Sequence, residues 1–589
     1  MRYINYLLIL IFSFSLVSCG GSSSSSRKND DGQLSKLNGN RYQGGVFRFN
    51  ETEYFRSLYP LNITEVVGHR IANQIYEGLV IFDQDNLDII PALAESWEVS
   101  NDATLYTFKI RKGVRFHDDK CFDDGKGREV TAHDFKYCFD RTCEADVNNQ
   151  GFWIFKDLVK GANAYNKETA KGNKPEGGVS GIRVIDDYTL QVELERPFAV
   201  FLSRLALTFA YVYPKEAVEE YGMELRDYAV GTGPFKLKIV SPDISVVLIK
   251  NENYWGTDDA ENALPYLDGI KVTFIKEEKV ELLDFKQGNL DLKYRLPLEL
   301  ITEIIDLEGN LKPGYDKFTL QEAVEMSVQY YGFLMPHEVF GNIDVRKAFN
   351  YALDRQKIVD YTLKGQGIPA YHGIVPAAFD SYPFDKVEGY KYDPSKARAH
   401  LAKAGYPDGV GFPPSVLQIN SGGGRNEQIA EAIQKMLQET LNIDISINQV
   451  VWAQHTETVE TAKVGFWRLG WVADYPDPEN FLNLLYSIHV PESLKDKAYI
   501  NSFRYVSPAY DKAFEEAIRT LDKAERYEKY AEADQIAMKD AVILPIYYSK
   551  NNRLLNPRVR NFPQNPMEYR NFRDVYFVPE DEADAIAKK

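Results

Sequence analysis

The residue whose position most directly predicts chemistry is Cys19, at the end of a short apolar N-terminal segment. Arg2 precedes an apolar run from Leu7 to Val17, and the run ends in Leu16-Val17-Ser18-Cys19. A bilayer span needs roughly 20 apolar residues, so the shorter run predicts a cleaved secretion signal. The ending is a lipobox, whose cysteine becomes lipidated. We expect residues 1–18 to be a lipoprotein signal peptide and Cys19 to carry the anchor; an ordinary signal peptide with an incidental cysteine is the alternative.

Three further cysteines could form one disulfide bond. Cys121, Cys138 and Cys143 lie close together in the sequence. An exported chain meets an oxidising environment, in which cysteines pair. Cys138 falls inside a helical pattern, whereas Cys121 lies in a Gly/Asp-rich loop and Cys143 lies just past the expected helix end. We predict a Cys121–Cys143 bond; three free thiols are the alternative, and the spacing does not match a metal site.

The sequence contains no recognisable catalytic motif. It has neither a Gly-x-Ser-x-Gly elbow nor a His-Glu-x-x-His helix. The eight histidines are scattered, and their one acidic cluster, residues 117–119, is typical of a solvated turn. The glycine-rich run 421–425 lacks the Lys-Ser/Thr of a phosphate loop. We expect no metal and no cofactor, although the paired carboxylates of a secreted hydrolase are left open as an alternative.

Composition limits the function classes further. The net charge of −17 excludes a general nucleic-acid binder, which needs a basic surface. The 38 tyrosines suit cavities that hold amphipathic ligands, although most will pack in cores or on the surface. Residues 19–40 are rich in glycine, serine and other polar residues, which predicts a flexible tether. The remaining chain of about 550 residues is too long for one core and predicts two or three lobes.

Local patterns indicate an α/β protein. Alternating residues predict half-buried strands at 45–49, 106–110 and 189–194. Helical spacing begins at Val345 behind a possible Asp344 cap, and further helices are expected from Ser507-Pro508 to about Thr520 and over 524–540. One helical face is followed directly by a strand in which Ile443, Ile445 and Ile447 alternate; the face consists of Ile429, Ile433, Leu437 and Leu441.

Five segments, in this order, resemble the family 5 solute-binding proteins, the oligopeptide and dipeptide receptors of ABC importers. Each string is weakly specific, but their order and spacing together extend over most of the chain. The segments are AESWEV (94–99) with TFKIRKGVRFHD (107–118), GTGPF (231–235) with NENYW (251–255), DVRKAFNYALDRQKIV (344–359), GWVADYPDPENFL (470–482) and LPIYY (544–548).

The resemblance implies a three-lobed periplasmic binding protein type II-like fold (cluster C), in which two ligand-gripping lobes close about a hinge. It divides the chain into lobe I (41–76, 215–276 and 551–589), lobe II (77–214) and lobe III (277–550). It also implies capture of short peptides in an extended form, with their backbones paired to protein strands, and delivery to the permease and ATPase subunits of an importer. We expect a monomer that contacts the membrane only through its lipid.

The resemblance also implies which residues meet the ligand. Asp474 falls where oligopeptide receptors bind the α-ammonium group, and Arg468 where they meet the carboxylate end. From the residues alone, Asp474 could instead cap the turn at 475–478, and Arg468 could be a solvated strand residue. Pocket walls are expected at Trp452 and Trp471, each of which could instead be core. Ala473 and Tyr475, beside Asp474, complete the expected site.

Two departures from the family pattern leave the preferred peptide length open. Val459 stands where the family has a second carboxylate-reading arginine, and Asn426 stands where it has a histidine with a similar role. Arg425 could replace that charge. A receptor for a non-peptide solute, such as a metal chelate, haem or a sugar, is the main alternative, because relatives of this family bind such solutes.

Overall fold

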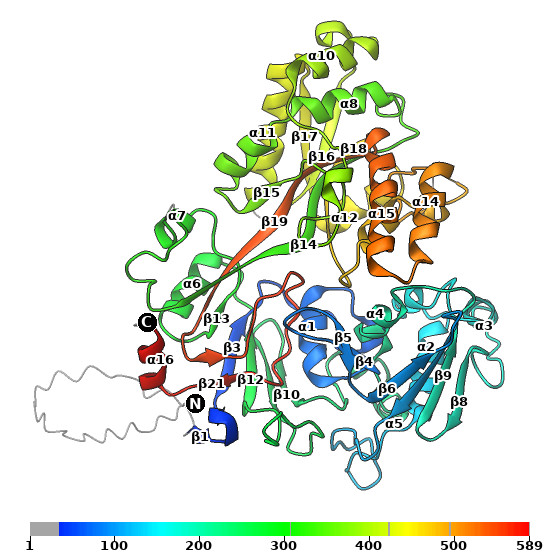
Figure 1. Ribbon diagram of the computed structural model, residues 1–589, viewed down its shortest axis with the longest axis vertical. Coiled ribbons are helices and arrows are strands. Elements are labelled where there is room, and N and C mark those ends of the chain that lie inside the picture. The colour runs from blue at the N-terminus through cyan, green and yellow to red at the C-terminus, as the bar shows by residue number, and fades with distance from the viewer. Residues whose placement is uncertain (1–33, 307, 422–423, 494–495, 588–589) are drawn as a thin grey trace, which may run out of the picture.

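The centre of the molecule is a mixed sheet of eleven strands, in the order β10-β11-β12-β3-β13-β19-β14-β18-β16-β17, with β15 added beside β19 (Figure 1). The structure, a computed structural model, describes residues 34–306, 308–421, 424–493 and 496–587. The strands are β3 (Val46–Asn50), β10 (Phe235–Ser241), β11 (Ser245–Lys250), β12 (Gly269–Thr273), β13 (Leu292–Lys293), β14 (Thr319–Phe333), β15 (Gly367–Pro369), β16 (Ser415–Asn420), β17 (Ile445–Val450), β18 (Phe466–Val472) and β19 (Ile543–Leu555).

Two long strands, β14 and β19, join the two halves of the molecule. They contain 15 and 13 residues and pair antiparallel, from Thr319 opposite Leu555 to Gly332 opposite Ile543. At one end β19 pairs with β13, and at the other β14 pairs with β18. Figure 1 shows both strands running obliquely from the lower half of the molecule to the upper half. A hinge between lobes I and III requires connections of this kind, in which two strands lie side by side and both cross from one lobe to the other.

Lobe III forms the upper half in Figure 1. The helix predicted from apolar spacing is α11, and its predicted face is buried. Helix α8 begins behind Asn342, whose side chain accepts a hydrogen bond from the Asp344 N–H, so Asn342 rather than Asp344 is the cap. Ser507 caps α14, as expected. The helices are α8 (Ile343–Ala352), α9 (Arg355–Lys357), α10 (Pro394–Lys403), α11 (Gly424–Leu441), α12 (Trp452–Glu460), α13 (Glu479–Leu482), α14 (Pro508–Ile518) and α15 (Lys523–Lys539).

Lobe II contains a separate antiparallel sheet in the order β6-β7-β9-β8. Its strands confirm the predictions at 106–110 and 189–194. Helix α2 begins with a capping box between Thr131 and Asp134 and continues to Cys143. The elements of this lobe are β4 (Val80–Phe82), β5 (Ile89–Pro91), β6 (Ala94–Val99), β7 (Leu105–Ile110), α2 (Ala132–Cys143), α3 (Ala162–Thr169), β8 (Ile182–Asp186), β9 (Thr189–Glu193) and α4 (Phe201–Leu205), with α5 (Lys215–Tyr221) following.

Lobe I is assembled from segments that are far apart in the sequence. Strand β3 pairs in parallel with β12, across more than two hundred residues of chain. Buried charges join the N- and C-terminal segments, because Glu51 accepts hydrogen bonds from both Arg70 (3.1 Å) and Arg570 (2.8 Å). These ion pairs hold together segments that are too far apart in the sequence to be joined by local contacts. Its other elements are β1 (Ser35–Lys36), β2 (Tyr42–Gln43), α1 (Val66–Ile75), β20 (Val559–Arg560), β21 (Tyr576–Phe577) and α16 (Glu580–Ala587).

The predicted disulfide is wrong. Cys121, Cys138 and Cys143 are all free thiols in the structure. Cys143 is the last residue of α2 rather than a loop residue after it, and it is completely buried in the lobe core. Cys121 is partly exposed in its loop. The helix therefore directs the Cys143 thiol into the core, where burial raises its pKa and keeps it protonated.

Two predicted boundaries also differ from the structure. Residues 34–40 are not part of a free tether, since β1 pairs with β2 and the Asn38 N–H donates to Asn262. Helices α6 (Glu278–Lys286) and α7 (Ile301–Ile304) flank β13, which pairs with β3, so 277–318 lies beside lobe I and the chain enters lobe III through β14. The predicted signal peptide and Cys19 lie outside the described residues. Among the described helices, none is long and apolar enough to cross a membrane.

Candidate ligand-binding site

The candidate site lies along β18, the strand of lobe III that pairs with the hinge strand β14. The pairing runs from Phe466 opposite Phe333 to Val472 opposite Ser327, and the Ala473 N–H extends it by donating to Met326 O (2.9 Å). Arg468 lies within the strand, whereas Asp474 lies two residues beyond its end, in a bend. The two charged residues are therefore carried by one short stretch of chain beside β14.

A buried asparagine, Asn480, holds Asp474 and Trp471 in place. Its side-chain oxygen accepts hydrogen bonds from Trp471 Nε1 (2.8 Å) and from the Asp474 N–H (3.1 Å). Its amide nitrogen donates to Asp474 Oδ2 (3.1 Å). Asn480 is 5% exposed and lies in α13. Sequence reasoning missed this residue; its only signal was its position near the start of a short helix, six residues after Asp474.

Asp474 does not cap the turn that follows it. The carboxylate that accepts a backbone hydrogen bond in this turn is Asp477, whose Oδ1 accepts from the Glu479 N–H (3.0 Å). The side chain of Asp474 instead has an exposed surface. Surrounding protein nevertheless desolvates its carboxyl and raises its pKa, whereas the Asn480 hydrogen bond and the charge of Arg204 lower it. The Asp474 carboxylate is therefore surrounded by protein but still reaches solvent.

Arg468 is held by neutral amides. Its Nη1 donates to Asn420 Oδ1 (3.0 Å) and its Nη2 donates to Gln329 Oε1. Among the described residues, no carboxylate forms an ion pair with this guanidinium. Arg468 and Asn426 line the same small cavity of about 10 Å³, which has room for about one water molecule. The structure therefore brings together the two residues that the resemblance assigned to the ligand's carboxylate end.

The remaining predicted residues have different surroundings. Tyr475 is buried and its hydroxyl donates to Glu479, so it supports the loop from the interior. Trp452 is 51% exposed at the start of α12 and packs beside His455, not beside Asp474. Arg425 is half-buried in the first turn of α11, next to Asn426. Val459, which stands where the family has an arginine, is buried as a core residue.

Tyr499 is a second residue that sequence reasoning missed. Its ring lies 6.1 Å from that of Trp471, measured between centroids, and it is 65% exposed. Desolvation raises its pKa to about 12, and the charge of Asp474 contributes to that rise. The loop is fixed on both sides, by the Ala498 N–H donating to Glu460 O and by the buried Asn501. A fixed yet exposed aromatic ring therefore stands beside the Asp474 carboxylate.

Lobe II contacts lobe III directly behind this site. Arg204 of α4 lies 3.6 Å from Glu479, and both side chains are at least nine-tenths buried. The guanidinium also lies over the rings of Phe198 and Trp153. A backbone hydrogen bond from Ala199 to Ile518 O joins the same two lobes. The loop that carries Asp474 is therefore mechanically and electrostatically linked to lobe II.

Two halves that share two long hinge strands are the architecture of a solute-binding protein of the periplasmic binding protein type II-like fold. The sequence profile of the bacterial extracellular solute-binding proteins, family 5 (middle region), matches residues 88–489, and the chain belongs to this family. The predicted family and fold are confirmed.

Three similar proteins illustrate the family. Heme-binding protein A of Haemophilus influenzae is 30% identical over 526 residues, which cover 88% of this chain and 89% of that protein. The periplasmic oligopeptide-binding protein OppA of Salmonella typhimurium is 28% identical over 541 residues, covering 90% and 92%. The structure of DppA from Helicobacter pylori in complex with the peptide STSA has a TM-score of 0.74 at 26% identity, covering 91% of this chain and 98% of that one.

Proposed function

We propose that this protein captures short peptides in an extended form and delivers them to an ABC importer. The carrying observation is that Arg468 in β18 and Asp474 just beyond its end carry opposite charges, and that each is held by neutral amides. Asp474 then binds the ligand's α-ammonium group, and Arg468 binds its carboxylate end. The names of the similar peptide-binding proteins support the same ligand class.

The spacing of the two charges limits the ligand. Asp474 is six residues after Arg468, and a fully extended chain sets an upper limit of about 20 Å between their Cα atoms at about 3.3 Å per residue. An extended peptide needs about five or six residues to cover that upper limit, and the bend at Asp474 shortens the distance to be covered. We therefore propose a preference for peptides of about three to five residues.

Binding of both ligand ends is testable by calorimetry. A tri-alanine peptide is titrated into the full chain, beside its N-acetylated and its C-amidated analogues. Acetylation removes the ammonium group that Asp474 pairs with, and amidation removes the carboxylate that Arg468 pairs with, so each analogue is expected to bind at least tenfold more weakly. Equal affinity for all three ligands contradicts the proposal. Chromatography of the recovered peptide tests the hydrolase alternative, because a receptor leaves it uncleaved.

Haem is the second candidate ligand, because Heme-binding protein A of Haemophilus influenzae is among the similar proteins. Haem carries carboxylates that Arg468 could bind, but it has no ammonium group for Asp474. Titration with haem, followed by its absorption spectrum, separates the candidates: saturable haem binding that Asp474→Asn leaves unchanged favours haem, whereas peptide binding that this substitution weakens favours the peptide.

We further propose that the protein is exported and anchored by lipid at Cys19. The lipobox sequence supports this proposal. Mass spectrometry of the N-terminal fragment from the membrane fraction tests it, since a diacyl-modified Cys19 is expected and an unmodified N-terminus contradicts it. Replacement of Cys19 by serine should release the protein from the membrane without changing peptide affinity.

A further inference from the structure

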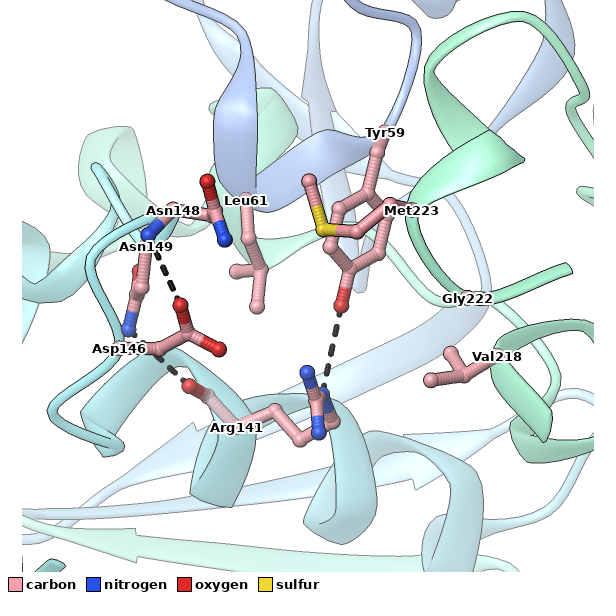
Figure 2. A pocket seen from close by; sticks show the side chains of 9 residues that line it. All are labelled: Tyr59, Leu61, Arg141, Asp146, Asn148, Asn149, Val218, Gly222 and Met223. Carbon is pink, nitrogen blue, oxygen red and sulfur yellow. Dashed lines mark hydrogen bonds between the residues drawn. The ribbon is translucent and has the colours of Figure 1, made fainter.

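A second pocket lies on the flank of lobes I and II, and no residue of lobe III lines it (Figure 2). Its volume is about 140 Å³. It opens where the segment after α2 meets the 3-10 helix Pro60–Asn62 and the end of α5. The residues that line it are Tyr59, Leu61, Arg141, Asp146, Asn148, Asn149, Val218, Gly222 and Met223.

The interior of this flank pocket is apolar. Tyr59 and Leu61 form its floor and are 8% and 2% exposed. Val218 is half-buried on one wall, and Met223, at 56% exposed, lies at the lip. A cavity of about 150 Å³ lined by apolar side chains holds a benzene molecule. The flank pocket therefore has room for an apolar group of about four to six carbon atoms.

Arg141 supplies cationic donors to the pocket. Its Nε donates to the Tyr59 hydroxyl (3.3 Å), and its Nη1 is 3.4 Å from Glu144 Oε2. Glu144 also forms an ion pair with Lys174, so its charge is divided between two cations. Among the described residues, Arg141 Nη2 has no hydrogen-bond partner. A planar guanidinium with a free donor beside an apolar floor suits a carboxylate ligand.

Asp146 supplies the opposite charge across the opening. Its Oδ1 accepts from the Asn148 N–H (2.8 Å), which orders the loop, and its Oδ2 has no partner among the described residues. Figure 2 shows the Asp146 carboxylate beside Asn148 and Asn149, whereas the Arg141 guanidinium lies next to the Tyr59 hydroxyl. The Asn149 amide donates to Arg141 O, Thr142 O and Glu144 O, so the end of α2 is fixed. The two charges are thus presented by ordered segments.

We propose that the flank pocket binds a free aliphatic α-amino acid of about the size of leucine. The ligand's carboxylate pairs with Arg141, its ammonium group pairs with Asp146, and its side chain packs on Tyr59 and Leu61. This site is separate from the peptide site and does not depend on Asp474.

Calorimetric titration of the full chain with L-leucine tests the proposal, beside N-acetyl-L-leucine and L-leucinamide, each of which lacks one of the two charges. L-leucine is expected to bind with one-to-one stoichiometry, and each analogue at least tenfold more weakly. Arg141→Gln and Asp146→Asn are each expected to weaken L-leucine binding at least tenfold. Met223→Trp changes an exposed lip residue and is expected to block the pocket, which provides a variant that does not depend on buried contacts.

The matched control is Asp474→Asn, which is expected to bind L-leucine as tightly as the parent protein does while losing peptide affinity. The fold of every variant is checked by its melting temperature, and that of Arg141→Gln, Asp146→Asn and Met223→Trp also by an unchanged affinity for tri-alanine. Absence of saturable L-leucine binding overturns the proposal. So does L-leucine binding that Asp474→Asn abolishes but Arg141→Gln and Met223→Trp leave intact, because the ligand then occupies the peptide site.

Discussion

The contact between Arg204 and Glu479 leads to a prediction about lobe closure. Arg204→Met keeps the length and apolar stem of the side chain but removes its charge. Glu479 is then left buried without its cation, and removal of one partner of a buried ion pair costs about 3–5 kcal/mol. The charges are 3.6 Å apart, and desolvation already raises the pKa of Glu479, so protonation relieves part of the cost. We therefore expect Arg204→Met to destabilise the contact between lobes II and III by about 1.5–3 kcal/mol.

This cost applies only to the state in which lobes II and III are in contact, because Glu479 regains water when they separate. The substitution therefore shifts the population towards the open form, and peptide affinity falls about 10- to 100-fold, since about 1.4 kcal/mol corresponds to a factor of ten. Calorimetry gives the affinity, and small-angle scattering gives the radius of gyration without ligand. The paired variant Arg204→Met with Glu479→Gln removes the unpaired charge and should recover most of the affinity. Parent-like affinity in Arg204→Met refutes the reasoning.

Three further predictions concern single residues. Asp474→Asn should weaken tri-alanine binding at least tenfold at pH 7, and in the parent protein the affinity should fall as pH drops through the raised pKa of Asp474, which calorimetry at several pH values measures. Tyr499→Leu should weaken tri-alanine binding by about 0.5–2 kcal/mol, because the cation–π contact with the ligand's ammonium group is lost. Tyr392→Leu, which changes another exposed tyrosine, is the control. A Tyr499→Leu variant that binds as tightly as the parent protein contradicts this role of Tyr499. Asp534 is buried and its pKa is raised to about 6, so it binds its proton more tightly in the folded state than in the unfolded state. The free energy of unfolding should therefore fall as pH rises from about 4 to 6. Asp534→Asn should flatten that pH dependence, which urea unfolding measures.

Much of the fold follows from local patterns. The apolar spacing of 429–441 and the alternation of 443–447 predict α11 and β17, because a helix packed on a sheet has to bury one face. The cysteine prediction failed for a local reason as well: α2 continues to Cys143, so its thiol faces the core rather than a loop. Boundaries depend on caps and tertiary contacts, which a single residue at a helix end does not reveal.

The parts of the site that could not be predicted depend on contacts between distant residues. Asp474 and Arg468 were predicted only because the neighbouring sequence resembles a known family. Asn480 has no side-chain chemistry that marks it, and its role appears only when the loop after β18 folds back. Arg204 and Glu479 are separated by more than 270 residues, so no local pattern relates them. Positioning residues of this kind follow from the tertiary fold.

The structure uses two different ways to hold buried or half-buried charges. In lobe I, Glu51 forms ion pairs with Arg70 and Arg570. These pairs fix three chain segments and neutralise the Glu51 carboxylate. At the candidate site, Asp474 is held by the amide of Asn480, and Arg468 by the amides of Gln329 and Asn420. An amide orients a charged group through hydrogen bonds without neutralising it. Each charge therefore keeps most of its capacity for a counter-charge, which a zwitterionic ligand brings at both of its ends.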